Sequence, residues 1–249
     1  PVLEAEATRL QALRHRRLQR EPVSRIAGRR GFMALDLEIT PATLDPRPDT
    51  ETLVEAVVEV LREEARATAP LEIVDLGTGS GAILIALLRA LPQARGLGID
   101  ISAEALRVAA RNISAHGMAD RAQLGEGSWL EGSDATFDVI VSNPPYLPTA
   151  EIATLEREVT DYDPRLALDG GDDGLAAYRI IIDQAPTHLR AGGWLFLEHG
   201  AGQQDAVAAM LDPDGAARGS GRLRCFRDLS GRSRCVAKWH QLAGLSSKK

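Results

Sequence analysis

The stretch "LEIVDLGTGSGA", residues 71–82, decides the fold of this 249-residue chain. An unbroken apolar run over 71–77 is typical of a strand that is buried on both faces, and the "AILIALLRAL" that follows over 82–91 is typical of a helix. Between them, glycines remove β-carbons where the backbone must turn sharply and where a ligand can approach it. A strand, a glycine-rich turn and a helix predict the opening unit of an α/β domain.

The same alternation of strands and helices continues along the chain. Strands are predicted over 94–100, 122–127, 137–143 and 192–200, helices over 102–117, 174–190 and 203–211, and a closing hairpin over 222–240. Ser102 is expected to cap the helix over 102–117. Pro186 is expected to kink or end the last turn of the helix over 174–190. The predicted fold is therefore α/β. It is a seven-stranded Rossmann-like sheet, mostly parallel, with a C-terminal antiparallel hairpin and helices on both faces.

The residues before this unit predict an appendage and a first helix of the main domain. A helix is predicted over 3–20, a strand that could be half of a hairpin over 31–40, and a helix over 51–66. Asp49 or Thr50 is expected to cap the last of these. We therefore divide the chain into an N-terminal helix and hairpin over 1–45 and a main domain over 46–249.

Composition excludes some classes of protein. The chain is 44% hydrophobic and 26% charged, which is ordinary for a globular protein, and it has no apolar run of the roughly 18 residues that a membrane span needs. Two cysteines make no disulfide framework, so a cytoplasmic protein is expected. Residues 36–217 hold 12 Lys and Arg against 31 Asp and Glu, whereas both ends are basic. The excess of acidic residues over 36–217 argues against a nucleic-acid partner.

The glycine-rich turn and the acids near it predict a cofactor that contains adenosine. Asp100 ends the second strand, 19 residues after Gly81, where a carboxylate can accept both hydroxyls of a ribose. NAD and S-adenosylmethionine (AdoMet) share that ribose, so Asp100 does not distinguish them. Asp75, which we place at the mouth of the pocket, would repel a pyrophosphate but would attract the cationic sulfonium and amino groups of AdoMet. Unpaired N–H groups are also expected where the next helix begins.

A polar corner, "VSNPPYLP" over 141–148, ends the predicted fourth strand. The carboxyl end of this strand should open onto the same crevice as the glycine turn. Asn143 offers an amide oxygen, Pro144 and Pro145 offer carbonyls in a chain of fixed φ, and Tyr146 offers a flat ring. These groups suit a planar –NH₂. Two acceptors, the Asn143 side-chain oxygen and the Pro144 carbonyl, could hold its N–H bonds and aim its weakly nucleophilic lone pair at a methyl group.

The motifs "DLGTGSG" (75–81), "GIDIS" (98–102) and "SNPPY" (142–146), in this order, resemble those of class I AdoMet-dependent methyltransferases that act on a planar nitrogen. The flanking "DPRPDTETLVE" (45–55) and "YDPRLALDGGDDGLAAYR" (162–179) sharpen the resemblance to the release-factor glutamine N5-methyltransferases. The resemblance covers about residues 20–239. It implies that the substrate is the glutamine in the Gly-Gly-Gln loop of class 1 peptide-chain release factors, and that the products are N5-methylglutamine and S-adenosylhomocysteine.

The resemblance also implies site residues. Those expected to bind AdoMet are Gly77, Thr78, Gly79, Ser80, Gly81, Asp100, Ile101, Trp129 and Asn143. The catalytic residues that would hold the glutamine are Asn143, Pro144, Pro145 and Tyr146. The "PRPDTE" loop should border the pocket. Asp45 stands where the family usually has an apolar residue, which puts the local packing of that loop in doubt.

Other hypotheses stay open at this point. The same Asn-Pro-Pro-Tyr chemistry serves enzymes that methylate adenine in nucleic acids, and another protein glutamine could be the acceptor. An oxidoreductase that binds a dinucleotide would explain the glycine spacing but would leave Asn143 without a role. The five histidines lack metal-ligand spacing, so no metal is expected. A monomer is expected. The family also carries an N-terminal domain of several helices, whereas one helix precedes Arg20 here, so 1–45 is interpreted as a remnant of it.

Overall fold

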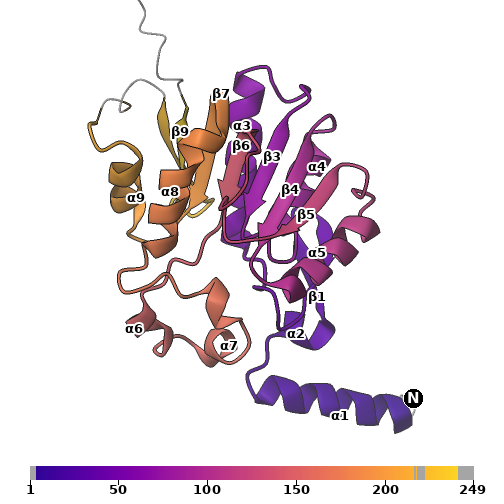
Figure 1. Cartoon of the computed structure of the whole chain (residues 1–249). Coiled ribbons are helices and arrows are strands. Elements are labelled where there is room, and N and C mark those ends of the chain that lie inside the picture. The colour runs from indigo at the N-terminus through magenta and orange to yellow at the C-terminus, as the bar shows by residue number, and fades with distance from the viewer. Residues whose placement is uncertain (1–3, 216, 218–221, 241–249) are drawn as a thin grey trace, which may run out of the picture.

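A computed structural model describes residues 4–215, 217 and 222–240. Within these residues, seven strands form one sheet in the order β5-β4-β3-β6-β7-β9-β8 (Figure 1). The strands are β3 (Glu72–Leu76), β4 (Arg95–Asp100), β5 (Ala122–Glu126), β6 (Phe137–Ser142), β7 (Leu189–Glu198), β8 (Leu223–Arg227) and β9 (Ser233–Trp239). The first five are parallel, and β9 pairs antiparallel with β7 and β8. The predicted α/β fold is confirmed. The last nine residues of the predicted main domain, 241–249, lie outside the described residues.

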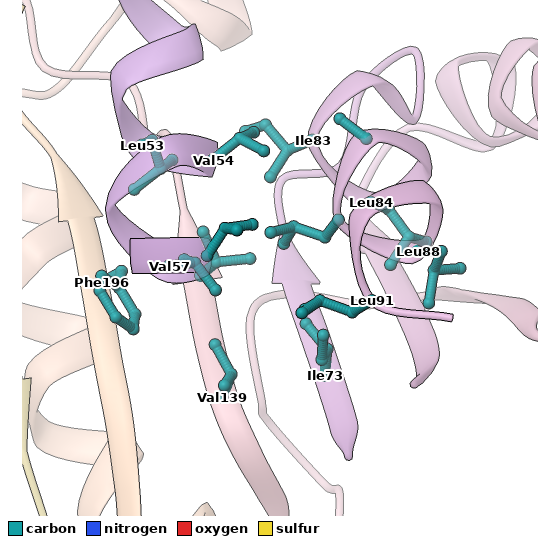
Figure 2. Packing of buried hydrophobic residues seen from close by; sticks show 14 of the residues in the cluster. Leu53, Val54, Val57, Ile73, Ile83, Leu84, Leu88, Leu91, Val139 and Phe196 are labelled. Atoms are coloured by element: carbon teal, nitrogen blue, oxygen red, sulfur yellow. The ribbon is translucent and has the colours of Figure 1, made fainter. Parts of the chain in front are cut away.

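Helices cover both faces of the sheet because its central strands are apolar on both sides. The helices are α3 (Glu51–Glu63), α4 (Ala82–Ala90), α5 (Ala103–Ala115), α8 (Ala176–His188) and α9 (Gln204–Leu211). On one face, Leu53 and Val57 of α3 and Leu84 of α4 pack over Ile73 and Val139 (Figure 2). Alternate strand residues point the other way and pack against α8 and α9. Each fully buried Leu or Val contributes about 1.5–3 kcal/mol, so the strand edges are held rigidly.

The N-terminal region contains α1 (Glu4–Leu18), α2 (Val23–Ala27) and a hairpin of β1 (Arg29–Phe32) and β2 (Leu35–Glu38). Helix α1 buries no residue, and the ion pair between Arg20 and Glu158, at 3.0 Å, helps to hold it near α7 (Arg157–Thr160). Phe32, Leu35 and Leu37, by contrast, share a core with α3. The hairpin therefore packs into the main domain, and the boundary at residue 45 stays a prediction.

Details differ from the sequence-based expectations around α3. Neither Asp49 nor Thr50 caps it with a side chain, because a 3-10 turn, η1 (Pro48–Thr50), leads directly into the helix. Asp49 instead pairs with Arg234 at 2.5 Å. Ser102 does cap α5, accepting from the Ala105 N–H at 3.2 Å. Pro186 lies inside α8, which ends two residues later at His188.

Short helical segments between β6 and α8 were not predicted from the sequence. They are α6 (Thr149–Ile152), α7 and η2 (Arg165–Ala167). Figure 1 shows α6 and α7 beyond one end of the sheet, on the same side as α1 and α2. No helix in the described part of the chain is both long enough and apolar enough to cross a membrane.

Candidate active site

The register of the two central strands brings the two candidate motifs to one edge of the sheet. Strands β3 and β6 are neighbours and parallel, with Leu76 opposite Ser142. The Ser142 hydroxyl also donates to the Leu76 carbonyl at 2.7 Å, which ties the two strand ends together. The next residues, Gly77 and Asn143, therefore leave the sheet side by side, since paired strands lie about 4.8 Å apart. The predicted position of the Asn143 corner beside the glycine turn is confirmed.

The glycine turn uses its backbone N–H groups inside the protein. Those of Gly77 and Thr78 donate to the Ile99 carbonyl at 2.8 and 3.0 Å. That of Gly79 donates to Oδ2 of Asp100 at 2.8 Å. Strand β4 therefore runs close enough to accept from these three N–H groups of the turn. They precede the helix start, where unpaired N–H groups are expected, and they are not available to a pyrophosphate.

The residues predicted to surround the adenosine lie beside this turn. The second oxygen of Asp100 accepts from the Ser102 N–H at 2.9 Å, and the neighbouring Ile101 is 55% exposed. Trp129 has a φ of 55°, an uncommon conformation for a bulky residue. Its ring lies 3.7 Å from the place that a β-carbon on Gly77 would occupy. An acid, an aliphatic face and an aromatic face therefore adjoin the turn.

Thr78 and Ser80 are buried, so they can offer a ligand backbone atoms only. The Thr78 hydroxyl donates to Oδ2 of Asp75 at 2.7 Å. Asp75 is itself fully buried beneath the turn, and no group bonds to its Oδ1. The prediction that this acid lies at the mouth of the pocket is wrong, since its strand carries it into the core. Burial and, to a lesser extent, the nearby charge of Asp100 raise the pKa of Asp75 to about 7, although the hydrogen bond from Thr78 lowers it.

The Asn143 corner is rigid and presents two acceptors. Asn143 Nδ2 donates to the Thr50 hydroxyl at 3.1 Å. Among the residues that the structure describes, nothing donates to Asn143 Oδ1 or to the Pro144 carbonyl. The Tyr146 carbonyl is held by Gln203 Nε2 at 2.9 Å. These contacts fix the corner while they leave both predicted acceptors available.

Glu198, at the end of β7, belongs to this corner, although no definite role was predicted for it. It is 2% exposed, and its Oε1 accepts from the Thr50 hydroxyl at 3.2 Å. No group bonds to Oε2. Burial raises the pKa of Glu198 to about 8, although the hydrogen bond from Thr50 lowers it. The signal in the sequence was an acid at the carboxyl end of the strand next to β6. His199 is also buried, and its ring bonds to the Gly200 carbonyl at 2.9 Å.

A pocket of about 320 Å³ adjoins the corner, which is within the range of small-ligand sites. Its walls come from the "PRPDTE" loop, the Asn143 corner and the segment from α6 to η2. They are Leu44, Arg47, Pro48, Asp49, Asn143, Tyr146, Leu147, Leu155, Val159, Ala167 and Leu168. The prediction that the "PRPDTE" loop borders the pocket is confirmed.

Comparison with known proteins then places the chain. Residues 50–162 match the family model described as "Methyltransferase small domain". A protein of Rhodospirillum rubrum called release factor glutamine methyltransferase is 49% identical over 98% of this chain and 72% of its own length. One of the same name from Bradyrhizobium diazoefficiens is 50% identical over 84% and 70%. This chain belongs to the release factor glutamine methyltransferase family.

A solved structure agrees with the fold of this family. A 16S rRNA methyltransferase of T. thermophilus, in complex with AdoMet and guanosine, matches with a TM-score of 0.60. It covers 86% of this chain and 50% of the other, at 18% identity, so the likeness shows the fold alone.

Asp45, which was expected to disturb the packing of its loop, is accommodated by polar partners. Asp45 is 3% exposed and accepts from the Ser24 hydroxyl at 2.5 Å, and Arg30 lies 3.4 Å away. The adjoining Asp163 pairs with buried Arg25 and, at 2.5 Å, with Arg47. Because each buried charge has a partner, the acid is compatible with a well-packed loop. The same network links α2 to the wall of the pocket.

Proposed function

We propose that this protein transfers a methyl group from AdoMet to the side-chain nitrogen of the glutamine in the Gly-Gly-Gln loop of class 1 release factors. The product would be N5-methylglutamine. One observation carries the proposal: two unused acceptors, Asn143 Oδ1 and the Pro144 carbonyl, stand at a rigid strand end beside the glycine turn. The names of the relatives support the choice of substrate.

The residues around the glycine turn fit AdoMet better than a dinucleotide. Three N–H groups of the turn donate to acceptors inside the protein and are not available to a pyrophosphate. A buried carboxyl also lies beneath the turn. The Asp100 carboxylate would hold the ribose hydroxyls, and Ile101 and Trp129 would flank the adenine. When bound, AdoMet supplies a methyl group on a positively charged sulfur. Both observations count against the dinucleotide hypothesis.

The Asn143 corner would do its work by holding a weak nucleophile. A primary amide nitrogen is poorly nucleophilic because its lone pair is delocalised. Asn143 Oδ1 and the Pro144 carbonyl would accept its two N–H bonds, fix its direction and move electron density onto it. Tyr146 would pack over the flat amide, since it lines the same pocket as Asn143. The extra proton would leave the nitrogen after methyl transfer.

The roles assigned to these residues, the cytoplasmic location and the monomeric state stay predictions. A cytoplasmic location follows from the substrate class, because release factors act on ribosomes. The division of the chain at residue 45 is also kept as a proposal.

Methyl transfer to a purified release factor tests the proposal. The protein is incubated with AdoMet carrying a labelled methyl group and with a class 1 release factor. A second reaction uses the same factor with Gln→Ala in its Gly-Gly-Gln loop, and a third uses ribosomal RNA. We expect label on the first factor only, with N5-methylglutamine in its digest. Equal label on both factors, or label on RNA alone, would refute the proposal.

A further inference from the structure

A chain of hydrogen bonds runs from the candidate catalytic amide into the protein interior. Asn143 Nδ2 donates to Thr50 Oγ1 at 3.1 Å, and Thr50 Oγ1 donates to Glu198 Oε1 at 3.2 Å. Asn143 directly follows β6, Thr50 ends η1 and Glu198 ends β7, so the three residues come from segments that are distant in sequence. Thr50 is 3% exposed and Glu198 is 2% exposed, so water does not substitute for either partner. The protein therefore holds both ends of this hydrogen-bond chain, Asn143 and Glu198, in place.

The direction of this chain depends on the carboxyl at its end. A hydroxyl has one hydrogen and can either donate or accept. Thr50 alone could donate to Asn143 Oδ1 as readily as it accepts from Nδ2, and the amide could then face either way. With Glu198 Oε1 as an acceptor behind it, the hydroxyl hydrogen is taken, and Thr50 can only accept from Asn143. The Asn143 –NH₂ is thus turned inward, which leaves Oδ1 facing the pocket.

We propose that Glu198 and Thr50 are positioning residues that orient the Asn143 carboxamide, so that its oxygen alone meets the substrate nitrogen. The proposal rests on the proposed function, because it explains why an N–H donor such as a primary amide is accepted at that oxygen. Neither residue needs to touch the substrate. A reversed Asn143 would present its own –NH₂ to the substrate –NH₂, and two donors would repel each other.

The surroundings of Glu198 favour this role over an ordinary salt bridge. Arg234, whose charge lowers the pKa of Glu198, pairs with Asp49 at 2.5 Å and with Asp228 at 2.9 Å, and not with Glu198. The phenol of Tyr178 donates to the Glu198 backbone carbonyl at 2.8 Å, which anchors the strand end. The phenol of Tyr146 and the thiol of Cys235 also lie close enough to feel the charge of Glu198.

Glu198 meets Thr50 through one oxygen. Burial raises the pKa of this carboxyl to about 8, whereas the Thr50 hydroxyl and the nearby Asn143 side chain lower it. Oε1 accepts from the Thr50 hydroxyl, and Oε2 has no hydrogen-bond partner among the described residues. A buried carboxyl costs stability. A buried carboxyl at this position is explained if Glu198 sets the direction of the hydrogen-bond chain.

Paired variants with a matched control test the proposal. Thr50→Val keeps the shape of the side chain and removes its hydroxyl, whereas Thr50→Ser keeps a hydroxyl. The control is Thr52→Val, which changes a nearby buried threonine that takes no part in the hydrogen-bond chain. We expect Thr50→Val to lower kcat on the release factor by about tenfold to a hundredfold, the range for a misplaced polar group. The Kd for AdoMet should change less than about twofold. Thr50→Ser should restore most of kcat, and Thr52→Val should match the unaltered protein.

Glu198→Gln tests the end of the chain. Glutamine is isosteric but carries a donor as well as an acceptor, so it permits both directions of the chain. We expect kcat to fall by about tenfold while the melting temperature stays the same or rises, since a buried carboxyl is removed. Full activity in both Glu198→Gln and Thr50→Val, or a loss in Thr50→Val that serine does not restore, would overturn the proposal.

A measurement on the protein alone separates this proposal from the proposed function. The Asn143 side-chain –NH₂ signals can be identified in ¹⁵N NMR spectra by their loss in Asn143→Ala. We expect them to exchange slowly with solvent in the unaltered protein and quickly in Thr50→Val. An unaltered protein that fails to methylate the release factor would refute the proposed function, yet the exchange comparison would still decide how Asn143 is held. Equal exchange in both proteins would refute the positioning role.

Discussion

Asp75 should make the stability of this protein fall as the pH rises toward neutrality. The residue is fully buried, and its Oδ1 has no partner. Burial raises its pKa to about 7, and Asp100 adds to the effect, whereas the Thr78 hydroxyl opposes it. In the unfolded chain the same carboxyl titrates at about 3.9. The folded state therefore holds a proton that the unfolded state releases across the whole interval between these values.

The sign and size of the effect follow from that difference. A raised pKa contributes stability that is complete below about pH 4 and is lost as the pH rises to about 7. The slope is about 1.4 kcal/mol per pH unit, so the interval gives at most about 4 kcal/mol. Asp75→Asn removes the titration and keeps an acceptor for Thr78. The free energy of unfolding of the variant, relative to the unaltered protein, should therefore improve by up to about 4 kcal/mol between pH 4 and pH 8.

Urea unfolding at a series of pH values, without AdoMet, measures this difference. Glu198 also has a raised pKa and adds a loss of the same sign, whereas the lowered pKa values of His199 and His240 act in the opposite sense. These groups are present in both proteins, so their contributions cancel in the comparison. Glu198→Gln is the control, because it should leave the effect of Asp75→Asn unchanged. A difference that stays constant within about 0.5 kcal/mol would show that Asp75 titrates normally and would refute the reasoning.

Three further predictions concern the site. Asn143→Ala should lower kcat by about a hundredfold while AdoMet affinity weakens less, and unchanged turnover would show that the amide-holding role is wrong. Asp100→Ala should do the reverse, and calorimetry should show AdoMet affinity about tenfold weaker or worse; an unchanged Kd would exclude the ribose contact. Gly98→Ala should cost about 1–3 kcal/mol and weaken AdoMet binding, because the new β-carbon would lie 2.9 Å from the Thr78 hydroxyl. The control Gly125→Ala, whose β-carbon would be 3.8 Å from its nearest neighbour, should be nearly silent in both urea unfolding and binding.

Sequence patterns predicted the layers of the fold because they act over short distances. An apolar run such as 71–77 cannot face water on either side, so its place in the middle of a parallel sheet follows from its composition. The meeting of Gly77 and Asn143 followed in the same way, since both succeed parallel strands. Each prediction needed only the period of a segment and the rule that ligands bind at the carboxyl edge of such sheets.

The predictions that failed depend on partners far away in the sequence. Thr50 has the residue type and position of a helix cap, yet its hydroxyl bonds to Glu198, 148 residues later. Asp75, two residues before the first glycine, was predicted at the mouth of the pocket, yet it is fully buried and accepts from the Thr78 hydroxyl. Nothing in the local sequence distinguishes an acid that lines a pocket from one that is buried beneath it. The fine chemistry of the site is therefore decided by tertiary contacts.

The same arrangement, a buried carboxyl that accepts from a threonine hydroxyl, occurs on both sides of β6. Asp75, on β3, accepts from the hydroxyl of Thr78, and Glu198, on β7, accepts from that of Thr50. Each carboxyl is buried and has one oxygen without a partner, so each costs stability that an apolar residue would not. In both pairs the threonine belongs to a loop of the site: Thr78 to the glycine turn, and Thr50 to the segment that holds Asn143. Two unrelated elements would not both retain such a cost for packing alone. Each acid holds a threonine of a site loop, and for Glu198 this is the positioning role that we propose.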